Sequence, residues 1–437
     1  MSKKKLLAIN LNEFNLDFLK YGANKYNCPN IKKLLKFKKI KTYSIDKVQD
    51  KNLDPWVQNI SINSGKRSQN HGIFNLGEKM PNNFRQIWDL LSKKKKYSAI
   101  WGPMNTKFVN NKYIKIFLPD PWNDQTQIKP SELKDIYEIA RAYAHNYTDF
   151  SIIKNFQFFV NLLLYLIKTN IILSLLSFLP NCLKIYFRSG IKNYLLFFLF
   201  DIISLLIFRN ITKNENINFS LIFLNSLAHF QHNNWNNKKE EKDYFYFSEQ
   251  ILKIIFQIYK NYDSIIVYNG FSQKRIKPEF MLRPINPKKF FLGNGIKFKK
   301  FHSNMTNGAL ITFKDNKSLK NQFKKIKKIN ILGYKLFNIS IVNTTQLFCR
   351  LQIRSKINFG LSNFNKEIIK RNIFYEKKDS KIKFSINENI KQFLENISFI
   401  KTTGKHISDG ELFYQNLNID KKRIENIKIN NIIKDYF

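Results

Sequence analysis

Short apolar runs alternate with helical patterns over the first 150 residues. The apolar runs at 6–11 and 98–101 predict strands, and so does the run at 56–62. Apolar residues at helical spacing predict helices over 29–38 and 84–93. Because strands that alternate with helices usually form a parallel sheet, we expect a sheet covered by helices on both faces.

The segment 156–208 breaks this alternation, because Leu, Phe and Ile dominate it and charges are few. Its apolar runs are shorter than the ~20 residues that a membrane-spanning helix needs. Lys168 and Pro180 are among the residues that interrupt them. A helical cap packed over the sheet is one interpretation. An amphipathic insert on a membrane surface, with its Lys residues at acidic headgroups, is the second, and spanning helices are the third.

The α/β pattern then resumes and fades again towards the C-terminus. A strand at 219–225, a helix at 243–260 and a strand at 264–268 are expected, and 307–355 alternates like a small antiparallel or α+β unit. The predicted organisation is 1–150 as the first part of an α/β core, 151–215 as a hydrophobic helical insertion, 216–300 as the second part of the core, 301–400 as a small α+β elaboration, and 401–437 as a return to the core.

Composition fits a large folded chain with an anionic partner. The 437 residues are 43% hydrophobic and carry a formal charge of +42. Only eleven of the 74 basic residues are Arg, whereas base and phosphate recognition favours Arg. We therefore expect no specific nucleic-acid site, and attraction instead to anionic substrates or lipid surfaces.

Cysteine usage and the N-terminus predict a cytoplasmic protein, with membrane association through 156–208 as the open alternative. Cys28, Cys182 and Cys349 are far apart and match no disulfide pattern. The basic start at 1–5 precedes too short an apolar run for a cleavable signal peptide.

Candidate metal ligands follow the predicted strands. His229 and His232 stand three residues apart directly after the apolar run at 219–224, and His406 lies near the C-terminus. Neutral imidazoles at the carboxyl edge of a buried sheet converge on one crevice and are common metal ligands. Hydrogen-bonded histidines in a buried cleft are the alternative.

A second candidate lies after the predicted strand at 56–62. Ser64-Gly65, followed by Lys66, would present a hydroxyl and free backbone N–H groups to a phosphate or sulfate if a helix opened there. An ordinary turn gives the same sequence.

Taken together, these motifs resemble the alkaline phosphatase superfamily, in particular its type I phosphodiesterase and nucleotide pyrophosphatase-like branch. The resemblance covers roughly 4–125, 218–275 and 402–413. The matching segments are Cys28-Pro29-Asn30-Ile31, Ser64-Gly65 through His71-Gly72, Leu118 through Trp122, and Gly404 through Gly410.

The resemblance implies a fold, a metal centre and a departure from the family pattern. The implied fold is α/β, a mostly parallel sheet sandwiched by helices. In such enzymes two divalent ions, often zinc, activate a Ser or Thr nucleophile and the leaving oxygen. Ser64, His232 and His406 stand where the family has its nucleophile and histidines. The family's aspartates are replaced by Asn12, Ala228 and Asn269, and the following His by Gly270.

Two hypotheses follow. The first is a divergent hydrolase or transferase of phosphate or sulfate esters. Its nucleophile would be Ser64, Lys66 would hold the anion, and Gly65 and Asn269 would contact substrate. One divalent ion, with zinc as the first candidate, or none, would be bound by a set drawn from His229, His232, His406, Asn12 and Glu13. The second hypothesis is a pseudoenzyme that binds an anionic glycan or lipid at a membrane surface. Both leave the oligomeric state open.

Overall fold

The computed structural model describes residues 4–437 apart from 47–52, 79, 82, 124–126, 147–152, 154, 191, 285, 304–307, 332–333, 336 and 352–396. The chain forms two compact units. The first comprises the described parts of Met1–Arg141, Ile153–Arg275 and Gly404–Phe437, and the second those of Ala142–Ile152 and Ile276–Thr403. Much of the predicted elaboration at 301–400 therefore lies outside the described residues.

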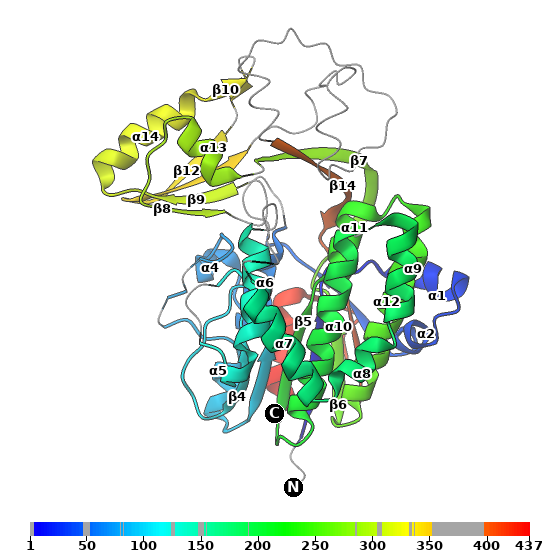
Figure 1. Ribbon diagram of the computed structural model, residues 1–437. Coiled ribbons are helices and arrows are strands. Elements are labelled where there is room, and N and C mark those ends of the chain that lie inside the picture. The colour runs from blue at the N-terminus through cyan, green and yellow to red at the C-terminus, as the bar shows by residue number, and fades with distance from the viewer. Residues whose placement is uncertain are drawn as a thin grey trace. The chain divides into compact units, whose positions relative to one another are not determined.

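An eight-stranded sheet forms the centre of the first unit (Figure 1). Its order is β16-β2-β15-β6-β1-β5-β3-β4, and all its neighbouring strands are parallel except where β15 pairs with β2 and β6. The strands are β1 (Leu6–Leu11), β2 (Lys38–Tyr43), β3 (Ser98–Trp101), β4 (Ile114–Leu118), β5 (Phe219–Leu224), β6 (Ser264–Tyr268), β15 (Asp409–Gln415) and β16 (Arg423–Glu425). This confirms the predicted mostly parallel α/β fold.

Helices cover both faces of this sheet, and alternate residues of β1 enter separate cores. Leu7, Ile9 and Leu11 pack in one cluster, whereas Leu6 and Ala8 pack in the other. The first face is covered by α1 (Leu16–Lys25), α2 (Pro29–Leu35), α10 (Asn193–Thr212), α11 (Ser226–Asn234) and α12 (Lys238–Tyr259), and the second by α3 (Pro55–Ser64), α5 (Ile87–Lys93) and α16 (Ile429–Tyr436). The period-2 alternation of the strand produces this sandwich.

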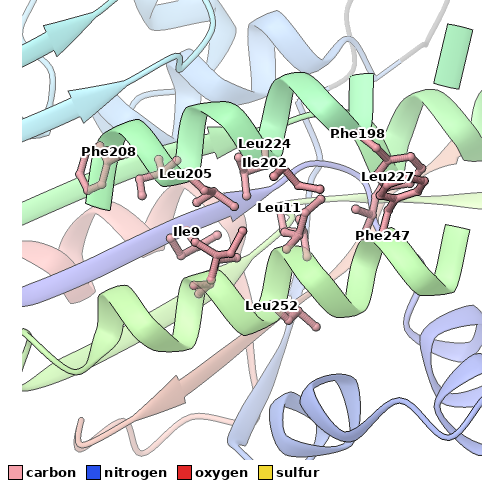
Figure 2. Close-up of a cluster of buried hydrophobic side chains, with 14 of the residues drawn as sticks. Ile9, Leu11, Phe198, Ile202, Leu205, Phe208, Leu224, Leu227, Phe247 and Leu252 are labelled. Carbon is pink, nitrogen blue, oxygen red and sulfur yellow. The ribbon is translucent and has the colours of Figure 1, made fainter. Parts of the chain in front are cut away.

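The hydrophobic insertion is helical and contributes to the first core. It contains α7 (Phe156–Lys168), α8 (Ile171–Leu176), α9 (Leu179–Ser189) and α10. By length and composition alone α10 is apolar enough to cross a membrane. However, Phe198, Ile202 and Leu205 of α10 are fully buried, and they face β1 and α12 in Figure 2. In this unit α10 is therefore a core helix.

The strand predicted at 56–62 is wrong, because these residues lie within the helix α3. Pro55 occupies its first turn, and Gly65 ends it in the left-handed conformation with φ 69°. All ten residues of α3 are buried. A helix that is buried all round lacks an amphipathic period, so its short apolar run cannot be distinguished from a strand by pattern.

The second unit contains a four-stranded antiparallel sheet of order β12-β13-β9-β8. Leu319 and Ile326 of α14 pack in its core with Ile311 and Leu347 of the sheet, as expected for a small α+β unit at 307–355.

The remaining elements that the structure describes are α4 (Ser68–His71), η1 (Ser131–Leu133), α6 (Lys134–Asn146), β7 (Ser272–Pro284), α13 (Pro287–Gly293), β8 (Lys300–Ser303), β9 (Gly308–Thr312), α14 (Asn316–Lys328), β10 (Asn330–Ile331), β11 (Tyr334–Lys335), β12 (Phe337–Asn343), β13 (Gln346–Leu351), β14 (Ile397–Ile407) and η2 (Asn426–Lys428).

Candidate metal centre

Polar side chains follow the three adjacent parallel strands β6, β1 and β5, at the point where each strand ends. Asn12 and Glu13 follow β1, Asn225 follows β5 and Asn269 follows β6. The carboxyl ends of parallel strands meet at one edge of a sheet, which is where α/β proteins bind ligands. This edge carries the candidate site.

Glu13, His232 and His406 form a compact group of possible metal ligands at this edge. The Oε2 atom of Glu13 lies 3.0 Å from Nε2 of His232 and 3.0 Å from Nε2 of His406. The two Nε2 atoms are 3.3 Å apart. Segments separated by more than 170 residues therefore bring three ligand atoms to one point.

Different elements supply the three side chains. Glu13 lies in the turn after β1, His232 lies near the end of α11, and His406 lies near the end of β14, just before β15 enters the sheet. Glu13 has φ 54°, a left-handed conformation that is uncommon for a residue other than glycine. Such strain persists only where the surrounding structure enforces it, and it is frequent at functional sites.

The electrostatics of the group favour a charged carboxylate. Glu13 is 1% exposed, and this burial alone would raise its pKa. The charges and hydrogen bonds of His406 and His232 outweigh it and hold the pKa well below 4.5. Burial would lower the pKa of His406, but the Glu13 carboxylate raises it above 6.5. Without a metal, the Glu13 carboxylate therefore favours the protonated, ion-paired form of His406.

Neighbouring amides fix the orientation of Glu13. Gln273 Nε2 donates to Glu13 Oε2 over 2.6 Å, and Asn12 Nδ2 donates to Oε1 over 3.0 Å. Gln231 Nε2 donates to the Glu13 carbonyl over 2.8 Å. Partners of this kind orient metal ligands and tune their basicity. Asn12 thus contacts the carboxylate through its amide nitrogen, and its Nδ2 also donates to Asn225 over 2.7 Å.

These residues fit a single divalent ion. Two imidazoles and one carboxylate are the ligand set of several catalytic zinc sites, which keep one position open. Ligands bound tetrahedrally at about 2.0–2.1 Å are about 3.3 Å apart. The separations of 3.0, 3.0 and 3.3 Å found here are close to that value. The donors could therefore hold zinc with little movement.

His229 lies outside this group. Its ring stacks on Phe197 with centroids 3.5 Å apart and an interplanar angle of 11°. Burial, with a smaller effect from His232, lowers its pKa to about 3. His229 is therefore a neutral, packed side chain, and of the sequence pair only His232 faces Glu13.

Asp201 positions the helix that carries His232. Its Oδ2 accepts hydrogen bonds from the backbone N–H groups of Asn225, over 3.1 Å, and Ser226, over 2.9 Å. These groups open α11, where an acidic side chain satisfies unpaired donors. Burial raises the pKa of Asp201 to about 6. The core helix α10 thus anchors α11, the helix that carries the candidate metal ligand His232.

Asn269, which the sequence predicts as a substrate contact, hydrogen-bonds to the backbone at both ends of its amide. Its Nδ2 donates to the Phe14 carbonyl over 2.7 Å, and its Oδ1 accepts from the Glu411 N–H over 2.8 Å. Gly270 follows with φ 72°. Both ends of the Asn269 amide therefore hold backbone segments together beside the site.

Ser64 makes no hydrogen bond to Glu13, His232 or His406. Ser64 ends α3, and its hydroxyl donates to the Ile60 carbonyl over 2.7 Å. No helix opens at Gly65, whose N–H bonds to the Ser61 carbonyl, and Lys66 is exposed. The predicted anion cradle at Ser64 and Gly65 is therefore a helix C-terminus, where carbonyl groups disfavour anions.

Asp54, at the opposite end of α3, was missed by the sequence analysis. The backbone of its neighbour Leu53 hydrogen-bonds to His406, and the Asp54 charge contributes to the raised pKa of His406 after Glu13. Ten helical residues at 1.5 Å each separate it from Ser64 by about 13–15 Å. The Asp54-Pro55 pair is a helix-start signal that could have revealed this position.

His71 takes part in a separate buried network. Its Nδ1 accepts the Ile73 N–H over 3.1 Å, so Nε2 carries the proton and donates to Ser61 Oγ over 3.1 Å. The Ser61 hydroxyl donates to Asp46 Oδ2 over 2.5 Å. His71 therefore cannot accept a proton from Ser61, and the network holds the segment 65–73, which includes α4, in place rather than activating a nucleophile.

We expect His71 to make the fold sensitive to acid. Burial lowers its folded-state pKa to about 4 from 6.5, despite the nearby Asp46 charge. The unfolded chain therefore takes up this proton more readily than the folded protein does. As a result, the free energy of unfolding is highest above pH 6.5 and decreases as the pH falls towards 4. Between pH 7 and 4.5 the loss is about 2–3 kcal/mol. Urea unfolding of the wild type and of His71→Gln should show a smaller pH dependence in the variant, since other titrations are common to both. Equal pH dependences would contradict this assignment.

The chain matches no protein-family model and no curated protein. Similar solved structures include phosphonoacetate hydrolase from Sinorhizobium meliloti 1021, with a TM-score of 0.42, 9% identity and coverage of 100% of this chain and 96% of that one. Murine ectonucleotide pyrophosphatase/phosphodiesterase 5 has a TM-score of 0.44 and 8% identity, with 99% and 94% covered. A magnesium-bound variant of TAB5 alkaline phosphatase has 0.39 and 8%, with 99% and 97% covered.

The names of these structural neighbours are those of a phosphonate hydrolase, a nucleotide pyrophosphatase/phosphodiesterase and an alkaline phosphatase. At TM-scores below 0.5 and identities of 8–9%, they define no activity for this chain. The function is therefore inferred from its own residues.

Proposed function

We propose that this protein is a metal-dependent hydrolase or transferase of phosphate or sulfate esters, with its reaction centre at Glu13, His232 and His406. The observation that carries the proposal is the convergence of these ligand atoms within 3.0–3.3 Å at the carboxyl edge of the sheet. The motif resemblance supports the ester class. The charge of +42 favours anionic substrates.

In this proposal the three side chains hold one divalent ion, zinc being the first candidate. When bound, such an ion polarises an ester oxygen and makes water more acidic. Gln273 and Asn12 keep the Glu13 carboxylate in place through the hydrogen bonds given above. Asp201 holds the N-terminal end of α11 in place, and α11 carries His232. None of these supporting groups needs to change protonation during turnover.

We assign Asp54 as the general base, in place of the expected Ser64 nucleophile. Asp54 is 7% exposed and close to His406, at the N-terminal end of α3. A carboxylate there can accept the proton of an attacking water or alcohol. Ser64 lies at the other end of the same helix, and its hydroxyl already donates to Ile60.

Asp54→Asn is expected to lower kcat about 10²–10⁴-fold, which is the usual contribution of a general base. The fold should persist, because Asn has nearly the same shape as Asp and caps helices equally well. Zinc-loaded protein would be assayed with p-nitrophenyl phosphate, bis(p-nitrophenyl) phosphate and p-nitrophenyl sulfate.

Ser64→Ala is the matched control on the same helix, and we expect its turnover to stay within about threefold of the wild type. If Ser64→Ala abolishes turnover and Asp54→Asn does not, the nucleophile is Ser64 as the sequence predicted. If the zinc-loaded wild type turns over none of these esters, the proposal for this substrate class fails.

A pseudoenzyme that binds an anionic glycan or lipid is the second candidate function. The observation that favours it is that Asn12 and Asn269, which stand where the resemblance implies acidic ligands, are both engaged in hydrogen bonds to the protein. It predicts a metal-free centre in which Glu13 and His406 remain an ion pair. Metal content therefore separates the two candidates.

A further inference from the structure

The helices α7, α8 and α9 expose an unusual concentration of apolar side chains. Twelve of the seventeen exposed large hydrophobic residues in the described chain lie between Ile153 and Leu196. We call the outer surface of these helices the α7–α9 face; it comprises Phe156, Leu163, Leu164, Ile167, Leu173, Leu176, Leu179, Leu183, Tyr186 and Phe187. Exposed apolar patches of this kind mark membrane or protein contacts.

Helical spacing places this face opposite the residues that hold the helices to the core. In α9, Leu179, Leu183 and Phe187 follow each other at four-residue intervals and are exposed. Ile185 of the same helix is 3% exposed and belongs to the core cluster. Leu166, Ile171 and Phe178 are buried in the same way. The helices α7, α8 and α9 thus pack on the core through one apolar side and expose a second apolar side to solvent.

The charge of the segment complements an anionic surface. Residues 151–200 contain no Asp or Glu, but they contain five Lys and Arg residues. Arg188 and Lys192 pair with Asp243 and Glu240. Lys168 and Lys184 are exposed at the ends and flanks of the apolar rows. Basic residues beside exposed apolar residues are typical of helices that lie in a membrane interface.

We propose that the α7–α9 face docks on the surface of a bilayer that contains anionic phospholipid. The helices have 13, 6 and 11 residues, so the longest is about 20 Å long, which is too short to span a hydrocarbon core of about 30 Å. The helix α10 is long enough but is buried in the core beneath them. The contact is therefore interfacial, and it does not depend on the proposed catalytic function.

Flotation of the full chain with vesicles tests the proposal. The wild type is expected to float with phosphatidylcholine vesicles containing about one third phosphatidylglycerol, and much less with pure phosphatidylcholine. Leu173→Ser with Phe187→Ser should lower the bound fraction at least roughly tenfold, because the inserted apolar area is lost. Both side chains are exposed, by 66% and 79%, so the fold should persist.

Leu292→Ser with Ile341→Ser is the matched control, since these side chains are 51% and 61% exposed in the second unit. It should bind as the wild type does. Lys168→Gln with Lys184→Gln should remove most of the preference for phosphatidylglycerol vesicles. The proposal is overturned if the wild type does not float or if the Leu173/Phe187 variant floats equally well. A dimer that this variant converts to a monomer in size-exclusion chromatography would instead assign the face to a second copy.

Discussion

Glu13→Gln is expected to abolish the stabilisation of this protein by zinc. Gln keeps the shape of the side chain but removes the negative charge that holds two imidazoles within 3.0 Å. A neutral amide is a poor zinc ligand, so we expect the affinity to fall at least about 100-fold. Saturating zinc at 100 times its dissociation constant adds about 2.7 kcal/mol to the unfolding free energy of a protein that binds it. In thermal unfolding with zinc and with a chelator, the wild type should therefore show a clear Tm difference and Glu13→Gln almost none.

His229→Leu provides the control for that experiment. His229 stands three residues from His232 in the same helix, but it stacks on Phe197 and lies outside the ligand group. Its replacement should retain the zinc-dependent Tm difference. If His229→Leu loses this difference and Glu13→Gln keeps it, the ligand assignment is wrong.

Phe198→Ala is expected to lower the free energy of unfolding by about 3–5 kcal/mol. Phe198 is fully buried in α10, and its ring lies 5.2 Å from that of Phe247 and 6.1 Å from that of Tyr244. Removing it leaves a cavity between the insertion and the helices on the sheet. The effect should be seen as a lower midpoint of urea unfolding.

Leu196→Ala, two residues earlier in α10, should change the unfolding free energy by less than about 1 kcal/mol, because Leu196 is 42% exposed. Similar small effects of both substitutions would show that α10 is not part of the core. The insertion would then have to be placed elsewhere, for example in a membrane.

The strands β1, β5 and β6 could be predicted because fully buried parallel strands appear as short continuous apolar runs. The same rule failed for α3, since a helix buried on all sides gives the same signal. Pattern also identified the division of the insertion into several helices. It could not show that α10 turns one row of side chains into the core while α7–α9 expose another, because both are equally apolar.

Only part of the candidate site could be predicted, because its geometry depends on backbone conformation and tertiary structure. Residue order along the chain placed Asn12 at the position of a family aspartate, with Glu13 beside it. Only the backbone shows that the left-handed turn at Glu13 directs the carboxylate towards His232 and His406. Asp54 was missed because its proximity to His406 depends on tertiary structure across more than 350 residues.

The most direct test of the metal centre is a zinc titration of chelator-treated wild-type protein by isothermal calorimetry, beside Glu13→Gln. We predict saturable binding of about one equivalent per chain to the wild type. Binding should be accompanied by proton release, because metal binding requires a neutral His406 whose pKa is raised in the free protein. The absence of saturable binding to the wild type, or equal binding to Glu13→Gln, would contradict a metal centre at Glu13, His232 and His406.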